Sequence, residues 1–201
     1  MTAKRNTAVA IIRNAAPFAI RAERASDVVA REALLDACFG DNRHTRTCQR
    51  LRDGRAPAAG LSLSAVRQDG RLVGTVRLWH VSAGGRDALM LGPLAVDHTC
   101  RGLGVGAALM QRAIEIARTR GHGAVILLGD APYYIRYGFS AAGMGELSLP
   151  GAFERERLLG LELKAGALDG AWGMIVPTGA PLPKTKAART RKAPLAVPHA
   201  A

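Results

Sequence analysis

The sequence has few cysteines, no long hydrophobic run and no acidic residue after Asp169. Cys38, Cys48 and Cys100 form no CxxC pair and no spacing typical of a metal site, so the sequence predicts no metal centre. An odd number of cysteines without a secretion signal predicts free thiols in a reducing cytoplasm. No apolar run approaches the length that spans a bilayer, which argues against a membrane protein.

The N-terminal segment is basic, because Lys4, Arg5 and Arg13 precede the first acid, Glu23. The apolar stretch 8–12 is too short for the core of a secretory signal. A mitochondrial-type presequence is basic and poor in acids, so it stays open as an alternative to a loose basic terminus. We expect residues 1–16 to be a flexible N-terminus.

The C-terminal segment, 179–201, combines positive charge with proline and alanine and shows no apolar period, which predicts a disordered basic tail. Its positive charges are Lys184, Lys186, Arg189, Arg191 and Lys192. Such a tail either contacts nucleic acid or an acidic surface, or is simply solvated. It has no aromatic residue to stack on a base, which argues against nucleic acid as a partner.

The remaining residues, 17–178, are enough for one domain, and 48% of the 201 residues are hydrophobic. Alternating patterns and turn signals, including Asp69-Gly70, predict an antiparallel meander, and helical spacing predicts helices before and after it. The predicted strands are 18–21, 61–68, 71–81, 88–96, 125–128, 139–142 and 159–163. The predicted helices are 27–39 and 104–120, with short helical segments near 41–54 and 132–138. We therefore expect an α/β fold with a mixed sheet, in which strand 125–128 runs parallel to strand 88–96.

The stretch Arg101-Gly102-Leu103-Gly104-Val105-Gly106-Ala107 separates a strand from a helix. Unpaired N–H groups and the helix dipole make such a helix start an anion site, and glycine lets several N–H groups converge on one phosphate. A plain turn with packing glycines is the alternative. A dinucleotide site is a further alternative, but no acid lies about 20 residues on, and no Gly-Lys-Ser/Thr follows as in a P-loop.

Two motifs together carry a resemblance to a family. Arg101-x-x-Gly104-x-Gly106 follows a "PLAVD" strand, and Tyr134-x-x-x-Gly138-Phe139 follows about 30 residues later. This combination resembles the GNAT-type N-acetyltransferases, and the longer pattern "LGPLAVD…RGLGVG…LLGD…YYIRYGFS" is similar to a bacterial branch of predicted acetyltransferases. The resemblance covers residues from about 18 to 163, and it implies a mostly antiparallel sheet whose two central strands splay apart.

The resemblance implies acetyl-CoA as co-substrate. It places the pyrophosphate on the backbone of residues 101–107. Pantetheine, which contains two amides, would pair with a free strand edge, and we expect Leu94, Ala95 and Val96 to form this edge. Pro93 favours an edge or a bulge at this point. The cofactor-binding residues expected on this basis are Leu94, Ala95, Val96, Arg101, Gly102, Leu103, Gly104, Val105, Gly106 and Ala107.

Tyr134 matches the general acid of the family, which protonates the leaving thiolate. Packing against CoA is the alternative role for this side chain. The family often uses a carboxylate on the fourth strand as general base, but residues 89–96 contain none. His80, Asp97 and His98 are candidates, and a water relay is our default.

The predicted function is therefore acetyl transfer from acetyl-CoA to the primary amine of a small molecule or a protein. A non-catalytic acyl-CoA-binding module and a basic nucleic-acid-associated protein are the alternatives, and a homodimer stays open because dimers are common in the family. A basic stretch would suit an acceptor that bears a carboxylate or phosphate, although a solvated basic face is the other interpretation. Its arginines are Arg43, Arg46, Arg50, Arg52 and Arg55.

Overall fold

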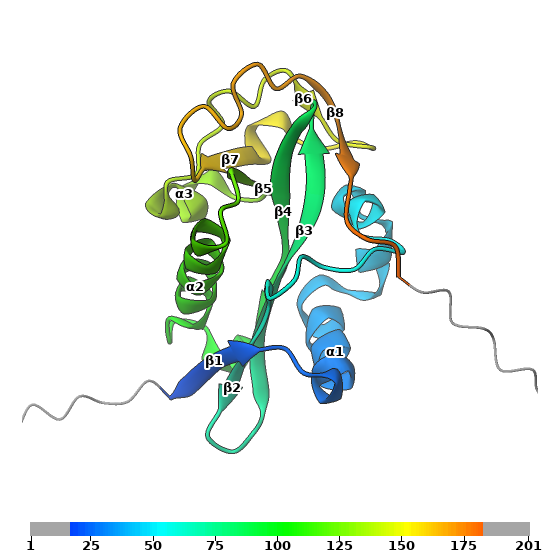
Figure 1. Ribbon diagram of the computed structural model, residues 1–201. Helices are drawn as coiled ribbons and strands as arrows, with labels where there is room; N and C mark the ends of the chain where they lie inside the picture. Colours follow the sequence, from blue (N-terminus) through cyan, green and yellow to red (C-terminus); the bar gives the residue numbers. More distant parts are fainter. Residues whose placement is uncertain (1–16, 183–201) are drawn as a thin grey trace, which may run out of the picture.

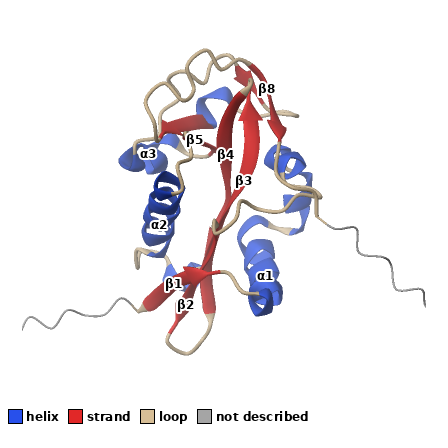
Figure 2. Ribbon diagram, viewed as in Figure 1, coloured by secondary structure: helices blue, strands red, loops and turns tan. Residues whose placement is uncertain are grey.

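An eight-stranded mixed β-sheet forms the centre of the protein in the computed structural model, which describes residues 17–182 (Figures 1 and 2). The main path of the sheet has the order β1-β2-β3-β4-β5-β7, and β8 pairs with both β3 and β6. The strands are β1 (Phe18–Ala22), β2 (Ser62–Arg67), β3 (Leu72–Ala83), β4 (Arg86–Val96), β5 (Ala124–Leu128), β6 (Leu147–Ser148), β7 (Leu158–Glu162) and β8 (Gly173–Pro177).

The helices and helical turns lie between these strands and are mostly short. The α-helices are α1 (Val28–Phe39), α2 (Val105–Thr119) and α3 (Ala131–Tyr134). The 3-10 turns are η1 (Ala25–Asp27), η2 (Asp41–Thr45), η3 (Thr47–Leu51), η4 (His98–Cys100), η5 (Ile135–Tyr137) and η6 (Arg155–Arg157). In Figure 1, α2 lies on one side of the long β3–β4 pair, and α1 with the two turns that follow it lies on the other.

The predicted α/β fold and antiparallel meander are confirmed, and so is the parallel pairing of β5 with β4. The predicted strand at 139–142 is wrong: Ser140 makes only an isolated bridge to Gly160 before the chain turns. Neither β6 nor β8 was predicted, because β6 has two residues and β8 depends on partners far away in the sequence.

The core lies on both faces of the sheet. The apolar face of α2 is fully covered, and its residues Leu109, Met110 and Ala113 have no exposed surface. α2 approaches β3 closely at Gly74, where an added Cβ would lie 2.8 Å from Val105 Cγ1. The opposite face holds a smaller cluster in which Leu34 and Leu35 of α1 pack against the sheet.

The first residues of the predicted basic tail, 179–182, are part of the described fold. The backbone N–H of Leu182 donates to the carbonyl of Gly54, and Ala180 accepts from Ala56, so residues just before 183 pack along the segment after η3. Residues 1–16, and the part of the predicted tail from 183 to 201, lie outside the described residues.

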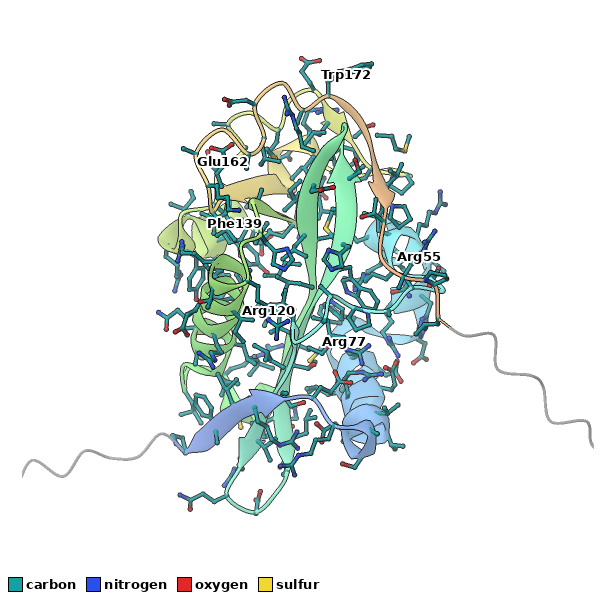
Figure 3. The ribbon with its side chains drawn as sticks, in the orientation of Figure 1. Arg55, Arg77, Arg120, Phe139, Glu162 and Trp172 are labelled. Atoms are coloured by element: carbon teal, nitrogen blue, oxygen red, sulfur yellow. The ribbon has the colours of Figure 1, made fainter. Side chains whose placement is uncertain are left out.

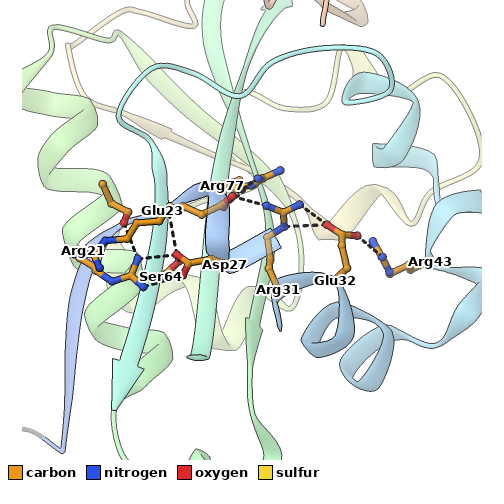
Figure 4. A network of polar contacts seen from close by, with 10 residues as sticks. Arg21, Glu23, Asp27, Arg31, Glu32, Arg43, Ser64 and Arg77 are labelled. Atoms are coloured by element: carbon orange, nitrogen blue, oxygen red, sulfur yellow. Dashed lines mark hydrogen bonds and ion pairs between the residues drawn. The ribbon is translucent and has the colours of Figure 1, made fainter. Parts of the chain in front are cut away.

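A buried network of charges joins α1 to the sheet (Figure 4). The Asp27 carboxylate accepts from both terminal nitrogens of Arg21, at 2.6 and 2.8 Å, and from the Ser64 hydroxyl at 3.0 Å. These donors, the Arg21 bond above all, hold the pKa of Asp27 far below its usual value.

The second centre of this network is Glu23, whose side chain is only 8% exposed. It accepts from Arg31 of α1 and from Arg77 of β3, with Arg77 Nε at 2.8 Å. Arg31 also pairs with Glu32, whereas Glu23 is the sole carboxylate paired with Arg77 among the described residues. The network therefore fixes α1 against β3 at the end of β1.

Replacement of Glu23 by glutamine keeps the shape of the side chain but leaves Arg77 without a charged partner. Removing one member of a buried ion pair costs about 3–5 kcal/mol, so we expect Glu23→Gln to lower the free energy of unfolding by that amount. Urea denaturation measures the loss. The matched control is Glu115→Gln, which removes an exposed pair with Arg112 and should cost less than about 1 kcal/mol. Equal stabilities of the two variants would contradict this account of the network.

Candidate active site

The sheet opens between β4 and β5. These parallel strands are paired only at Leu89 with Val125 and at Met90 with Ile126. β4 then continues for six further residues along β3 without pairing to β5. The splayed pair expected from the family resemblance is therefore present in the fold.

A β-bulge in β4 accompanies this opening. The pairing register with β3 shifts between Val76 and Leu78, opposite Gly92 and Pro93, which agrees with the bulge or edge expected from Pro93. Gly92 has φ +134°, a conformation that side chains with a Cβ rarely adopt. The Trp79 indole Nε1 donates to the Gly92 carbonyl at 2.7 Å and so anchors the bulge to β3.

Beyond the bulge, alternate residues of β4 point their backbone groups toward β3 or away from it. The backbone N–H of Asp97 donates to the carbonyl of Val73 on the β3 side, at 2.9 Å. Ala95 lies two residues earlier, so its backbone groups point to the same side. Ala95 therefore faces β3, while the backbone groups of Leu94 and Val96 face the opening. The Val96 carbonyl accepts from the Cys38 thiol at 3.4 Å, which leaves the Val96 N–H as its group toward the opening.

The glycine loop lies between η4 and α2. Gly102 and Gly104 have φ +78° and +79°, and a Cβ added at either would meet no atom within 4 Å. Arg101 and Leu103 are exposed beside them. This part of the loop therefore has open space on the side where side chains are missing.

The first turn of α2 presents free N–H groups in the same region. Ala108 N donates to Gly104 O at 2.9 Å, which is the first bond of the helix. The N–H groups of Val105, Gly106 and Ala107 precede this bond and have no partner among the described residues. Together with the helix dipole, they form a site suited to an anionic group.

A cavity of about 790 Å³ extends from the opening of the sheet to the η2–η3 segment. Its lining includes Gly92, Pro93 and Leu94 on β4, and Leu127 and Leu128 on β5. The lining also contains six arginines and four carboxylates, namely Arg43, Arg46, Arg52, Arg55, Arg77, Arg157, Glu32, Asp53, Asp130 and Glu154. Figure 3 shows Arg55 and Arg77 on the α1 side of the β3–β4 pair.

Tyr134 lines this cavity from α3. Its ring lies directly on the backbone of Gly129, where an added Cβ would stand 2.3 Å from Tyr134 Cε2. The Phe139 ring packs at 72° to it, with centroids 6.0 Å apart. Burial raises the pKa of Tyr134 above its ordinary value, and the nearby Asp130 carboxylate raises it further. The phenol is therefore protonated at neutral pH.

The neighbouring Tyr133 also lines the cavity. Its hydroxyl would lie 3.0 Å from a Cβ added at Gly106, so it reaches the first turn of α2. The Tyr137 hydroxyl donates to it at 3.4 Å, and burial raises the pKa of Tyr133 strongly. Tyr137 itself does not line the cavity.

The three side chains considered as general base lie outside the cavity lining. His80 packs against His122, with ring centroids 5.5 Å apart. Asp97 accepts from Thr99 N at 2.9 Å, and hydrogen bonds from Thr99 lower the pKa of Asp97 to about 2. His98 is 80% exposed.

Sequence reasoning missed two residues of the site, Gly129 and Arg157. Arg157 pairs with Asp130 at 3.2 Å, and its Nε is buried without a partner among the described residues. No local pattern marks Arg157. Gly129, by contrast, follows a buried strand and precedes the tyrosines, which is a signal for close packing.

Residues 17–182 hold neither a candidate metal cluster nor a membrane-spanning helix. No cluster of three or more histidine, cysteine, aspartate or glutamate side chains there could hold a metal ion. No helix in this range has the length and apolar character needed to cross a membrane. Cys38, Cys48 and Cys100 are free thiols.

Comparisons with known proteins agree on one family. The model of the acetyltransferase (GNAT) family matches residues 29–139. The uncharacterized N-acetyltransferase YhbS of Escherichia coli K12 is 31% identical over 163 residues, which span 78% of this chain and 93% of that protein. The uncharacterized N-acetyltransferase YjhQ of the same strain is 36% identical over 119 residues, spanning 57% and 64%.

Solved structures give the same result. The crystal structure of Escherichia coli YhbS in complex with CoA has a TM-score of 0.69 at 30% identity, and the match covers 81% of this chain and 91% of that one. A GNAT family acetyltransferase from Brucella melitensis in complex with acetyl-CoA has a TM-score of 0.56 at 26% identity, with 74% and 89% covered.

The contact between Gly129 and Tyr134 can be tested directly. We expect Gly129→Ala to displace the Tyr134 ring and to lower the free energy of unfolding by about 1–3 kcal/mol, because the new methyl group overlaps the ring. A crystal structure and urea denaturation measure the two effects. Gly145→Ala is the control, since a Cβ there would meet no atom within 4 Å. An unmoved ring in the Gly129 variant would refute the proposed packing.

Proposed function

Because this chain belongs to the GNAT family of acetyltransferases, we propose that it transfers an acetyl group from acetyl-CoA to a primary amine by direct attack of the amine on the thioester. The observation that carries the proposal is the unpaired edge of β4 in a cavity that also holds the half-buried phenol of Tyr134. The glycine loop does not line this cavity, but the first turn of α2 meets it through the Tyr133 hydroxyl at Gly106.

The pyrophosphate of acetyl-CoA would bind at the start of α2. The free N–H groups of Val105, Gly106 and Ala107 are suited to phosphate oxygens, and the open space at Gly102 and Gly104 accommodates them. Arg101 and Leu103 are exposed beside this site, where the arginine adds a positive charge. These residues are our proposed cofactor-binding loop.

The pantetheine arm would lie along β4 in the opening. Leu94 directs its N–H and C=O there, and Val96 directs its N–H there, so the two amides of pantetheine can pair with them as an added strand does. Ala95, between them, shapes the edge through its buried side chain. An N–H in this edge also suits the thioester oxygen, which becomes more negative during the attack.

Tyr134 would act as the general acid. The thiolate of CoA leaves when the amide bond forms, and a protonated phenol in the same cavity can donate a proton to the sulfur. Its raised pKa keeps this proton in place at neutral pH. Since His80, Asp97 and His98 lie outside the cavity lining, water within the cavity is our proposed route for the proton of the amine.

Two further assignments are part of the proposal. The three free thiols favour a reducing compartment, such as the cytoplasm. The acceptor is the amine of a small molecule or of a protein, and it would enter from the η2–η3 side of the cavity, opposite α2.

Binding of acetyl-CoA can be tested at Gly104. We expect the wild-type protein to bind acetyl-CoA in calorimetric titration, and Gly104→Glu to weaken binding roughly 100-fold or more, because a carboxylate would face the pyrophosphate. Gly143→Glu is the matched control. It adds the same charge at a glycine with φ +74° and open space, away from α2, so any backbone strain is shared. A folded wild-type protein that does not bind acetyl-CoA would overturn the proposal.

The role of Tyr134 can be tested by its replacement with phenylalanine. We expect Tyr134→Phe to lower kcat about 10²- to 10⁴-fold, the range for a general acid, with the affinity for acetyl-CoA unchanged. Release of free CoA measures the rate. In the wild-type protein the rate should fall only above pH ~10, where a tyrosine with a raised pKa begins to lose its proton, and this fall should be absent in the variant.

Tyr137→Phe serves as the control for this experiment, because it removes a tyrosine hydroxyl that lies outside the cavity. A Tyr134→Phe enzyme with normal kcat would leave packing against CoA as the role of this side chain.

A further inference from the structure

The arginines that line the cavity fall into two groups. Arg43, Arg77 and Arg157 each form ion pairs with carboxylates. The side chains of Arg46, Arg52 and Arg55 donate to backbone carbonyls instead and have no carboxylate partner among the described residues. The positive charge that is not neutralised within the fold is therefore gathered on the η2–η3 side of the cavity.

Two arginines of the second group have other structural contacts. Arg46 is exposed, its guanidinium lies 5.1 Å from the centre of the Phe39 ring, and it donates to the Phe39 carbonyl. Arg55 donates to the carbonyl of Gly179 at 2.9 Å, in the segment after β8. Arg50, from the same basic stretch, does not line the cavity and donates to the Pro150 carbonyl.

Arg52 differs from all of these. It is half-buried in the wall of the cavity, and the only hydrogen bond of its side chain among the described residues runs from Nε to the carbonyl of Cys48, at 3.0 Å. Both terminal nitrogens of the guanidinium are thus without a partner in the fold. The adjacent Asp53 accepts from Gln49 at 2.6 Å and forms no ion pair with Arg52.

The surroundings make this an unfavourable place for an isolated cation. Burial lowers the pKa of Arg52, the Asp53 carboxylate partly offsets this, and the positive charges of Arg43 and Arg46 act in the same direction as burial. An arriving anion would compensate the cost of burial, whereas a second ammonium group would add to the repulsion. The planar guanidinium presents its two free nitrogens in a fork that matches a carboxylate or a phosphate.

We propose that the acceptor is a small primary amine that also carries a carboxylate or phosphate group, and that Arg52 binds this anionic group. The inference rests on the proposed acetyltransferase function and names the substrate class of the same site. Small size follows from the cavity, whose 790 Å³ must hold the end of the pantetheine arm as well as the acceptor. With the anionic group at η3, the amine faces the edge of β4.

The test uses pairs of amines that differ only in the anionic group. The full-length protein is assayed with acetyl-CoA and the common amino acids, each beside its carboxamide, and with phosphoethanolamine beside ethanolamine. We expect kcat/KM to be about 10- to 100-fold higher for the anionic member of a productive pair, as expected for a charge-assisted hydrogen bond. The two kinds of pair distinguish a carboxylate from a phosphate.

Variants of Arg52 then connect this preference to the residue. Arg52→Gln can still donate to Cys48, so the local fold is preserved, yet it lacks the charge. We expect it to raise KM for the anionic amine about 10- to 100-fold, to change kcat little and to abolish the preference over the neutral amine. Arg52→Lys keeps the positive charge but lacks the forked guanidinium, so its KM for the anionic amine should lie between those of the wild type and Arg52→Gln. Arg118→Gln, an exposed change of the same charge on α2, is the control.

Calorimetry on the complex of the protein with CoA supplies a readout besides activity, because it measures binding of the anionic amine to wild type and to Arg52→Gln. Failure of the wild-type protein to bind acetyl-CoA would overturn the proposed function itself. If acetyl-CoA binds normally, three results would overturn only the substrate class. These are equal use of neutral amines, no acetylation of any anionic amine, or a preference that survives in Arg52→Gln.

Discussion

The bulge in β4 is the constraint on which the rest of the site depends. Before the bulge, the backbone groups of Leu89 face β5, and β4 and β5 pair. The bulge adds one residue to β4, so a different set of backbone groups faces away from β3 after it. β5 no longer pairs with this part of β4. The edge of β4 is thus unpaired although β4 lies in the middle of the sheet. In this position it is shielded from other chains, whereas an edge at the outside of a sheet is exposed to them. The hydrogen bond from Trp79 to Gly92 fixes the point of separation from the side opposite the opening.

The arginines that line the cavity separate into those paired with carboxylates of the fold and those without such a pair among the described residues. Glu23, Glu32 and Asp36 lie at or near α1, and they neutralise arginines from β3 and η2 that also line the cavity. These arginines are thereby held in place and contribute little net charge to a ligand. Arg52 comes from a segment whose neighbouring acid, Asp53, accepts a hydrogen bond from Gln49 and forms no ion pair with Arg52. We therefore propose that electrostatic selectivity of the cavity depends on Arg52, whose terminal nitrogens have no partner among the described residues, rather than on the whole basic stretch.

Much of the fold could be predicted from local patterns, and the failures have a common cause. Alternation and the Asp69-Gly70 turn indicate the meander, and the apolar face of α2 together with its glycines indicates the helix after it. β6 and β8 escaped because their pairing joins residues far apart in the sequence, and Ser140 was placed in a strand although only one bridge forms there. The site follows the same rule. Tyr134 belongs to a local sequence motif. Arg52 lacks a carboxylate partner because the fold places the nearby carboxylates beside other arginines, which no local pattern indicates.

The opening between β4 and β5 has no hydrogen bonds to fix its width, so packing must do so. Tyr134 rests on Gly129 at the end of β5, the Tyr133 ring meets Tyr134 edge-on at 4.9 Å, and the Tyr133 hydroxyl reaches Gly106 in the first turn of α2. This chain of contacts spans from one side of the opening to the other. Its two ends are glycines, and each lacks the Cβ that would push the adjacent ring away. The same packed rings therefore set the positions of the proposed acid and of the proposed phosphate site. The distance between these two sites depends on the volume of the side chains and not on backbone pairing.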